Sequence, residues 1–154
     1  MRKLKVYIDT SVIGGYFDDE FSIDTQLLFD EIQNGLYKLV LSDLTEKELV
    51  NAPETVRTLL IDLGIDFELV NVTQESIDLA TEYIKEKVVG QTSIDDCIHI
   101  ATATINKVDL LISWNFKHIV NFQRIRGYNS INLKNGYSTL EIRSPKDLIN
   151  YENR

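Results

Sequence analysis

The chain has 154 residues, of which 44% are hydrophobic and 26% charged, enough for one compact domain over residues 1–154 whose core needs no cross-links. Its single cysteine, Cys97, excludes an internal disulfide, and with only His99 and His118 beside it the chain cannot supply the four ligands of a structural zinc site. The basic start is too brief for a signal peptide and no apolar run reaches membrane-spanning length, so we expect a cytoplasmic protein without membrane contact.

The first half of the chain alternates between strand and helix patterns. Residues 4–8 are strand formers, and the Asp-Thr-Ser that follows suits a turn into a helix. Residues 24–34 have the apolar spacing of a helix and stop at Gly35. The next predicted elements are a strand over 37–41, a helix over 45–51, a helix over 54–63, a strand over 66–72 and a helix from 74 to about 88.

The second half continues the alternation. Residues 94–106 are apolar on nearly every face, which predicts a helix buried against a sheet. Residues 109–113 form a short apolar run typical of a parallel strand. A helix near 118–127, a strand near 139–143 and a helical turn after Pro145 complete the chain. The pattern predicts a three-layer α/β/α fold with a mainly parallel sheet, and a site outside the carboxyl ends of its strands.

Three acids are candidates for that site: Asp9, Glu48 and Asp96. Asp9 ends the first strand, and its alternative role is a helix N-cap. Glu48 and Asp96 each follow a hydroxyl residue by three positions, so each could close a capping box instead. We expect all three in the first turn of a helix, where the helix dipole favours an ionised carboxylate, so that capping and metal ligation are compatible.

Converging carboxylates repel one another, and a divalent cation relieves that repulsion. Ligand sets made only of oxygen favour Mg²⁺ or Mn²⁺ over zinc. Such an ion activates water and stabilises the leaving oxygen in phosphodiester cleavage. The sequence therefore predicts a metal-dependent phosphodiesterase.

The net charge of −8 argues against a nucleic-acid substrate, but the charges are unevenly distributed. Residues 1–106 contain eight basic and twenty acidic side chains, whereas residues 107–154 contain eight basic and four acidic ones. Six basic residues could form a strip that holds a polyanion: Lys117, Arg124, Arg126, Lys134, Arg143 and Lys146. An uneven but merely solvated surface is the alternative.

Other polar and aromatic residues have simpler interpretations. His99 lies one turn after Asp96, and in so apolar a helix we favour a hydrogen-bonded core histidine over a site residue. Trp114 is interpreted as a packing residue rather than a base-stacking one. Gly14 and Gly15 lack the lysine of a phosphate-binding loop and indicate flexibility or close packing.

The sequence contains four characteristic stretches in order: YIDTSVIGGYFD at 7–18, LSDLTEKELV at 41–50, DDCIHIATA at 95–103 and LLISWNFKHI at 110–119. Together they resemble the PIN-domain nucleases, particularly the VapC-type ribonuclease toxins. The resemblance implies an RNA substrate, Mg²⁺ or Mn²⁺, a homodimer and an antitoxin partner. A non-catalytic RNA-binding or scaffold protein that retains the fold is the alternative, and a phosphoacceptor domain is a weaker one.

The resemblance also implies roles for individual residues. Asp9, Glu48 and Asp96 correspond to acidic metal ligands, with Glu48 preferred to Glu46. The fourth family position, often Asp, is Asn115 here, which leaves the number of metal ions open. Asp95 is the alternative to Asp96 as the third acid, or a supporting residue beside it. The other implied supporting residues are Thr10 or Ser11 beside Asp9, and His118 at the phosphate or leaving group. The residues expected to bind substrate are Lys117, Arg124 and Arg126.

Overall fold

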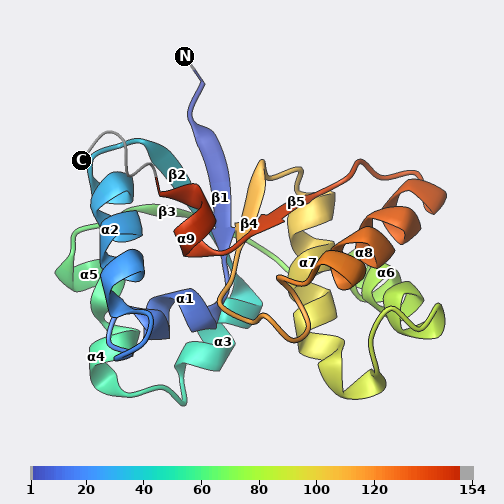
Figure 1. Ribbon diagram of the computed structural model, residues 1–154, viewed down its shortest axis with the longest axis horizontal. Coiled ribbons are helices and arrows are strands. Elements are labelled where there is room, and N and C mark those ends of the chain that lie inside the picture. The colour runs from blue at the N-terminus through green and yellow to red at the C-terminus, as the bar shows by residue number, and fades with distance from the viewer. Residues whose placement is uncertain (1, 150–154) are drawn as a thin grey trace.

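A five-stranded, wholly parallel sheet lies at the centre of the computed structural model, which describes residues 2–149 (Figure 1). The strand order is β3-β2-β1-β4-β5. The strands are β1 Leu4–Ile8, β2 Tyr37–Ser42, β3 Phe67–Val70, β4 Leu110–Ile112 and β5 Glu141–Arg143. The prediction of a three-layer α/β fold with a mainly parallel sheet is confirmed.

The sheet is covered by helices on both faces, which explains why its central strands are apolar runs. Figure 1 shows one layer with α1 Thr10–Gly15, α2 Ser22–Gln33, α4 Glu54–Arg57, α5 Leu59–Asp62 and α9 Pro145–Leu148. The other layer holds α6 Gln74–Lys85, α7 Ile94–Ile105 and α8 Phe122–Lys134. The short 3₁₀ helix η1 Gln91–Ser93 leads into α7, and α3 Asp43–Leu49 follows β2.

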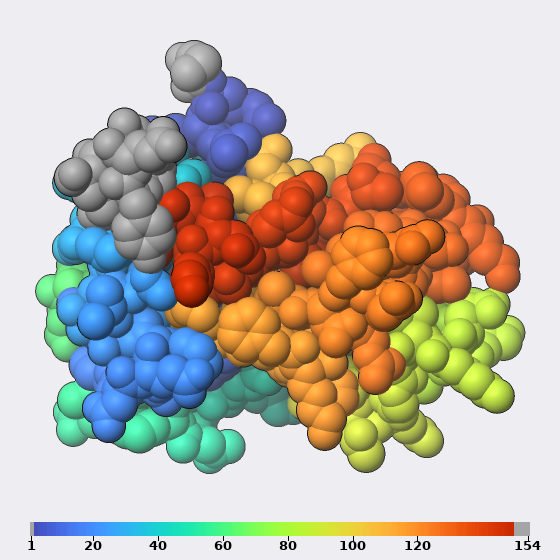
Figure 2. All heavy atoms as spheres, in the orientation of Figure 1, coloured from blue at the N-terminus to red at the C-terminus, as the bar shows by residue number. Residues whose placement is uncertain are grey.

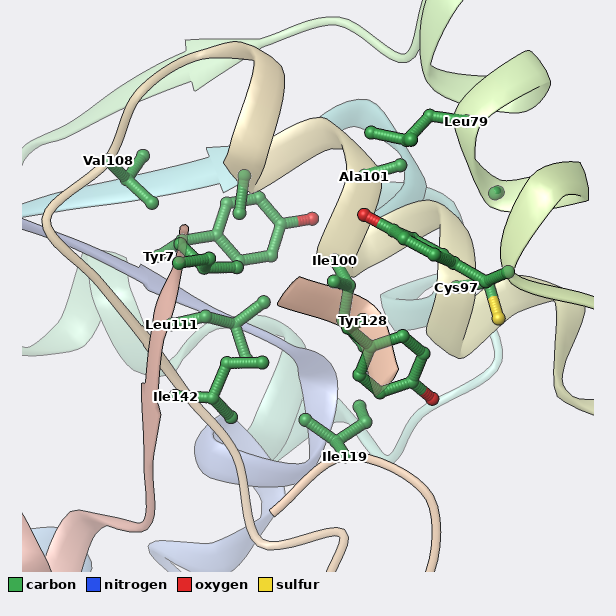
Figure 3. Packing of buried hydrophobic residues seen from close by; sticks show 14 of the residues in the cluster. Tyr7, Leu79, Cys97, Ile100, Ala101, Val108, Leu111, Ile119, Tyr128 and Ile142 are labelled. Carbon is green, nitrogen blue, oxygen red and sulfur yellow. The ribbon is translucent and has the colours of Figure 1, made fainter. Parts of the chain in front are cut away.

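Alternate residues of β1 point to opposite faces of the sheet and pack into two separate hydrophobic cores. Val6 and Ile8 pack with α1, α2 and α5, whereas Tyr7 packs with α6, α7 and α8. Figure 3 shows Tyr7 and Leu111 from the sheet in the same cluster as Ile100 and Tyr128 from the helices. None of the helices between residues 2 and 149 has the length and apolar character needed to cross a membrane.

Three predicted helices have different bounds in the structure. The helix expected over 45–51 begins at Asp43, because the Ser42 hydroxyl caps it by accepting from the Thr45 amide at 3.3 Å. The helix expected over 54–63 is two short helices that meet at Thr58. The helix expected near 118–127 begins only at Phe122, where the Asn121 side chain caps it, and continues to Lys134.

The order of the strands reverses between β1 and β4. The chain moves from β1 through β2 to β3 on one side, and β4 and β5 lie on the other. The helices and turns that leave neighbouring parallel strands diverge at such a point and leave a crevice outside the carboxyl ends. Register pairs Ile8 with Ile112, so the residues that directly follow them, Asp9 and Ser113, lie side by side.

Candidate active site

Asp9 directly follows β1 at the carboxyl end of the sheet, where such a crevice is expected, and is 5% exposed. It occupies the N-cap position of α1, but its side chain makes no capping hydrogen bond. Instead, the Ser11 hydroxyl donates to Oδ1 at 2.5 Å and the Ser113 hydroxyl donates to Oδ2 at 2.6 Å. Two loops that follow neighbouring strands therefore fix the orientation of one carboxylate.

The turn after β4 carries the next group of the crevice. The backbone amide of Asn115 donates to the Ser113 hydroxyl at 2.9 Å. The Asn115 side-chain amide donates to Oδ2 of Asp96 at 3.3 Å, and its carbonyl oxygen accepts from the His118 backbone amide at 2.9 Å. Asn115 thereby connects the turn after β4 to the first turn of α7, where Asp96 lies.

Glu48 reaches the crevice from the last turn of α3. Its Oε1 accepts from the Thr10 hydroxyl at 2.8 Å and lies 2.7 Å from Nε2 of His99. His99 is 2% exposed, and its Nδ1 is 2.5 Å from the Tyr7 hydroxyl, which in turn lies 2.7 Å from the Ser42 hydroxyl. A chain of three buried side chains, His99, Tyr7 and Ser42, thus sets the position of Glu48.

The three carboxylates influence one another's ionisation. Burial raises the pKa of Asp9 above its usual value, and the charge of Glu48 raises it further, against the opposing effects of His99 and the two serine hydroxyls. Burial likewise raises the pKa of Asp96, and the charges of Asp9 and Glu48 add to the increase. The acids from α1, α3 and α7 therefore share one electrostatic environment.

Glu48 and His99 behave as a pair. Burial alone would raise the pKa of Glu48, but the hydrogen bonds and charge of His99, with the Thr10 hydroxyl, lower it below the usual value. Burial alone would lower the pKa of His99, but Glu48, Asp9 and Asp96 together raise it. The pair favours an ionised Glu48 beside a protonated imidazole.

The crevice is a cluster of acids rather than a compact cage. Among residues 2–149, no three His, Cys, Asp or Glu side chains are close enough together to hold one metal ion directly. Apart from the His99 imidazole, the side chains linked here by hydrogen bonds are carboxylates, hydroxyls and an amide, whose oxygens are ligands of the kind that Mg²⁺ and Mn²⁺ prefer.

Residues 6–118 match the family model of the PIN domain, which is nearly three quarters of the chain. The chain belongs to the PIN domain family. No curated protein sequence matches it.

Three solved structures share the fold of this PIN domain. A toxin–antitoxin complex from Klebsiella pneumoniae has a TM-score of 0.53 at 18% identity, over 73% of this chain and 88% of that one. The structure of VapBC2 from Rickettsia felis bound to a promoter DNA fragment has a TM-score of 0.57 at 12% identity, over 92% of this chain and 98% of that one. FitAcB from Neisseria gonorrhoeae has a TM-score of 0.59 at 14% identity, over 93% and 99%.

The PIN domain brings the predicted acids together but corrects the reasoning about Glu48. That residue lies in the last turn of α3 and not in the first, because the helix starts two residues earlier than expected. Its capping-box role with Thr45 is therefore excluded. Asp96 does lie in the first turn of α7, but the Ser93 side chain makes no capping hydrogen bond.

The supporting residues divide into those in the crevice and those outside it. Ser11 contacts Asp9 as expected, whereas Thr10 binds Glu48 instead. The backbone amide of His118 donates to Asn115, which in turn donates to Asp96, and the charge of His118 lowers the pKa of Asp96. Asp95 is an exposed residue of α7.

The predicted basic strip is only partly available to a ligand. The Arg124 guanidinium donates to the Val88 carbonyl, so it helps to hold α8 against the loop after α6. Lys134 pairs with Glu86 at 2.9 Å. Arg143 pairs with Glu141. Lys117, Arg126 and Lys146 are exposed.

His99 is the residue whose role the sequence interpretation underestimated. It is a hydrogen-bonded core histidine, as favoured, and it also positions Glu48. The spacing of three residues from Asp96 along one helix was the available signal, because residues three apart share a face.

Replacing His99 by Leu is expected to destabilise the fold by about 1–3 kcal/mol, because the Tyr7 hydroxyl and the half-buried Glu48 each lose a partner. His99→Gln retains a side-chain hydrogen-bond donor and is expected to lose less stability than His99→Leu. Urea unfolding at neutral pH measures both variants. Equal losses for Leu and Gln would show that packing, and not hydrogen bonding, is the role of this position.

Proposed function

We propose that this PIN domain is a Mg²⁺- or Mn²⁺-dependent endoribonuclease. The observation that carries the proposal is the proximity of Asp9, Glu48 and Asp96: the charge of Glu48 acts on Asp9 and the charges of both act on Asp96, so that burial and this repulsion raise the pKa of Asp9 and Asp96. A buried group of acids whose repulsion His99 only partly offsets is suited to a divalent cation.

The acids divide the work of holding such an ion. Asp9, Glu48 and Asp96 would be its protein ligands, and Asn115 would contribute through water. Mg²⁺ commonly retains several waters and binds one or two carboxylates directly, which suits acids that are near one another without forming a closed cage. When bound, the ion activates a water molecule and neutralises charge at the phosphate.

The side chains around the acids have two roles in this proposal: most of them orient the carboxylates, and His118 contacts the substrate. Ser11 and Ser113 keep the Asp9 carboxylate in one orientation, and His99 does so for Glu48. His118 lies beside Asp96, and its Nδ1 is a buried nitrogen without a hydrogen-bond partner within residues 2–149. We assign His118 to a phosphate oxygen or to the leaving group.

We also propose that the chain is the toxin of a toxin–antitoxin pair and forms a homodimer. The support is the family match together with the fold shared with a toxin–antitoxin complex and with VapBC2 and FitAcB. Co-expression with the product of a neighbouring short reading frame, followed by measurement of the mass of the complex, tests both parts.

The direct test of the nuclease compares two adjacent acids of α7. Asp96→Asn is expected to lower cleavage of a fluorescent single-stranded RNA with Mn²⁺ by at least about a hundredfold, because it removes a charge that faces the ion. Asp95→Asn, which alters an exposed neighbour, is expected to retain wild-type activity. Equal activity in the two variants, or cleavage that persists in EDTA, would reject the proposal.

Two observations favour a second function, a non-catalytic RNA-binding or scaffold protein. Asn115 stands where the family often has an acid, and residues 2–149 contain no preformed three-ligand cage. Such a protein would bind RNA in EDTA with a steep salt dependence and show no turnover with Mn²⁺.

A further inference from the structure

An aromatic layer lies directly beside the acid cluster. Trp114 is 7% exposed, its indole nitrogen donates to the Thr25 hydroxyl at 2.9 Å, and its ring stacks on Phe21 with 4.2 Å between centroids. Both neighbours belong to or precede α2, so the indole is fixed in the core of one helical layer. Trp114 is a packing residue, as its sequence context indicated.

Phe116 extends this layer to the surface. Its ring meets Trp114 edge-on with 6.0 Å between centroids and lies 6.4 Å from Phe21. Phe116 is nevertheless 48% exposed. One side of the ring therefore rests on a rigid aromatic base while much of the remainder is open to solvent.

The backbone around Phe116 is held in place next to the acids. The preceding residue, Asn115, bonds Asp96 through its side chain. The backbone carbonyl oxygen of Asn115 accepts hydrogen bonds from the backbone amides of Ile119 and Val120 at 3.1 and 2.8 Å, which stabilises the turn. Figure 2 shows the orange segment after β4 in the middle of one face, beside the light-blue segment that includes α2.

Cations accompany the aromatic rings in this segment. Lys117 directly follows Phe116 and is exposed. Phe122 is 70% exposed, and the guanidinium carbon of Arg126 lies 5.7 Å from the centroid of its ring. Exposed rings alternating with Lys and Arg are typical of surfaces that bind single-stranded nucleic acid, where bases stack on the rings and phosphates pair with the cations. Protein interfaces are also enriched in aromatic residues and Arg but are depleted in Lys, so the exposed Lys117 is the residue that favours nucleic acid here.

We propose that Phe116 is a stacking platform for one unpaired base of the RNA, next to the proposed metal site at Asp9, Glu48 and Asp96, with Lys117 pairing to a phosphate of the RNA. This assignment rests on the proposed ribonuclease function and adds a subsite to it. Single-stranded RNA is the ligand class, because a base inside a duplex has no free face to stack on the ring.

The test measures binding separately from cleavage. Single-stranded RNA oligonucleotides carrying 2-aminopurine at successive positions are titrated with the wild-type chain in EDTA, and its fluorescence is quenched where that base stacks. Phe116→Leu keeps apolar volume but removes the ring and is expected to weaken binding by about tenfold and abolish the quenching at one position. Phe116→Trp is expected to restore both.

Phe67→Leu is the matched control, since Phe67 is 39% exposed at the start of β3, at the opposite end of the sheet, and is expected to leave RNA binding unchanged. Wild-type affinity and quenching in Phe116→Leu overturn the platform even if the wild-type chain cleaves RNA. Quenching at one position without cleavage by the wild-type chain supports the platform and rejects the nuclease. A loss of self-association in Phe116→Leu without a loss of RNA binding assigns the ring to a protein interface and overturns the proposal.

Discussion

Replacing Asp9 by Asn is expected to lower RNA cleavage by at least about a thousandfold while making the metal-free chain more stable. Asp9 is the most buried of the three acids and faces both loops of the crevice. Loss of its charge removes the central ligand of the proposed metal site, whose contribution to the transition state is several kcal/mol, or about three powers of ten in rate.

The gain in stability follows from the direction of the pKa shift. The pKa of Asp9 is raised in the folded chain, so ionisation of this carboxyl opposes folding at any pH above that raised value. Asparagine removes this penalty, and we expect the unfolding midpoint at pH 7 in EDTA to rise by about 2–4 °C, which corresponds to ~1 kcal/mol for a chain of this size. The difference should shrink as the pH falls through the raised value and disappear well below about 4, where the carboxyl is protonated in both states.

Thermal unfolding with and without Mg²⁺ completes the test of Asp9. The cation should raise the midpoint of the wild-type chain, because it binds only the folded state, and should leave that of Asp9→Asn nearly unchanged. Asp95→Asn is the control and should respond to Mg²⁺ like the wild type. A less stable Asp9→Asn variant in EDTA would contradict the proposed repulsion.

Replacing Gly15 by Ala is expected to destabilise the fold by about 1–3 kcal/mol, and Gly15→Val by more. A Cβ at this position would lie 2.8 Å from Cδ1 and Nε1 of Trp114 and 2.9 Å from the Thr25 hydroxyl. The indole must therefore move, and with it the hydrogen bond to Thr25. We expect a red shift of tryptophan fluorescence together with a lower midpoint in urea.

Gly14→Ala is the matched control for Gly15. A Cβ at Gly14 meets nothing within 4 Å, and alanine is the better helix former, so this variant should be as stable as the wild type or slightly more so. The Gly15 variant should also lose activity, because the Trp114 backbone amide donates to Ser11, which orients Asp9. Equal stabilities for the two alanine variants would contradict the close packing.

The fold could be predicted where burial dictates composition. Strands β1 and β4 are apolar runs covered on both faces, and their polar successors identified Asp9 and the turn at Asn115. The start of α3 could not be predicted in the same way, because Ser42 and Thr45 are both good N-caps and only the folded chain shows that Ser42 is used. That ambiguity misplaced Glu48 within its helix.

The contacts of long and buried polar side chains were harder to predict. The sequence predicts Arg124 at the substrate, yet its guanidinium donates a hydrogen bond to the Val88 carbonyl. Sequence spacing does not show in which direction a flexible side chain points. His99 lies among apolar residues that conceal a polar role, since its partners Tyr7 and Glu48 are 92 and 51 residues distant in the chain. Long-range pairs of this kind become visible only in three dimensions.

The position of β4 between β1 and β5 has a consequence for a chain that is still being synthesised. Asp9 accepts a hydrogen bond from Ser113, and Asp96 accepts one from Asn115. The site therefore cannot form completely until the segment after residue 112 has been synthesised and β4 has paired with β1. Under the proposed function, a product that ends before residue 113 would lack part of the site and is expected not to cleave RNA.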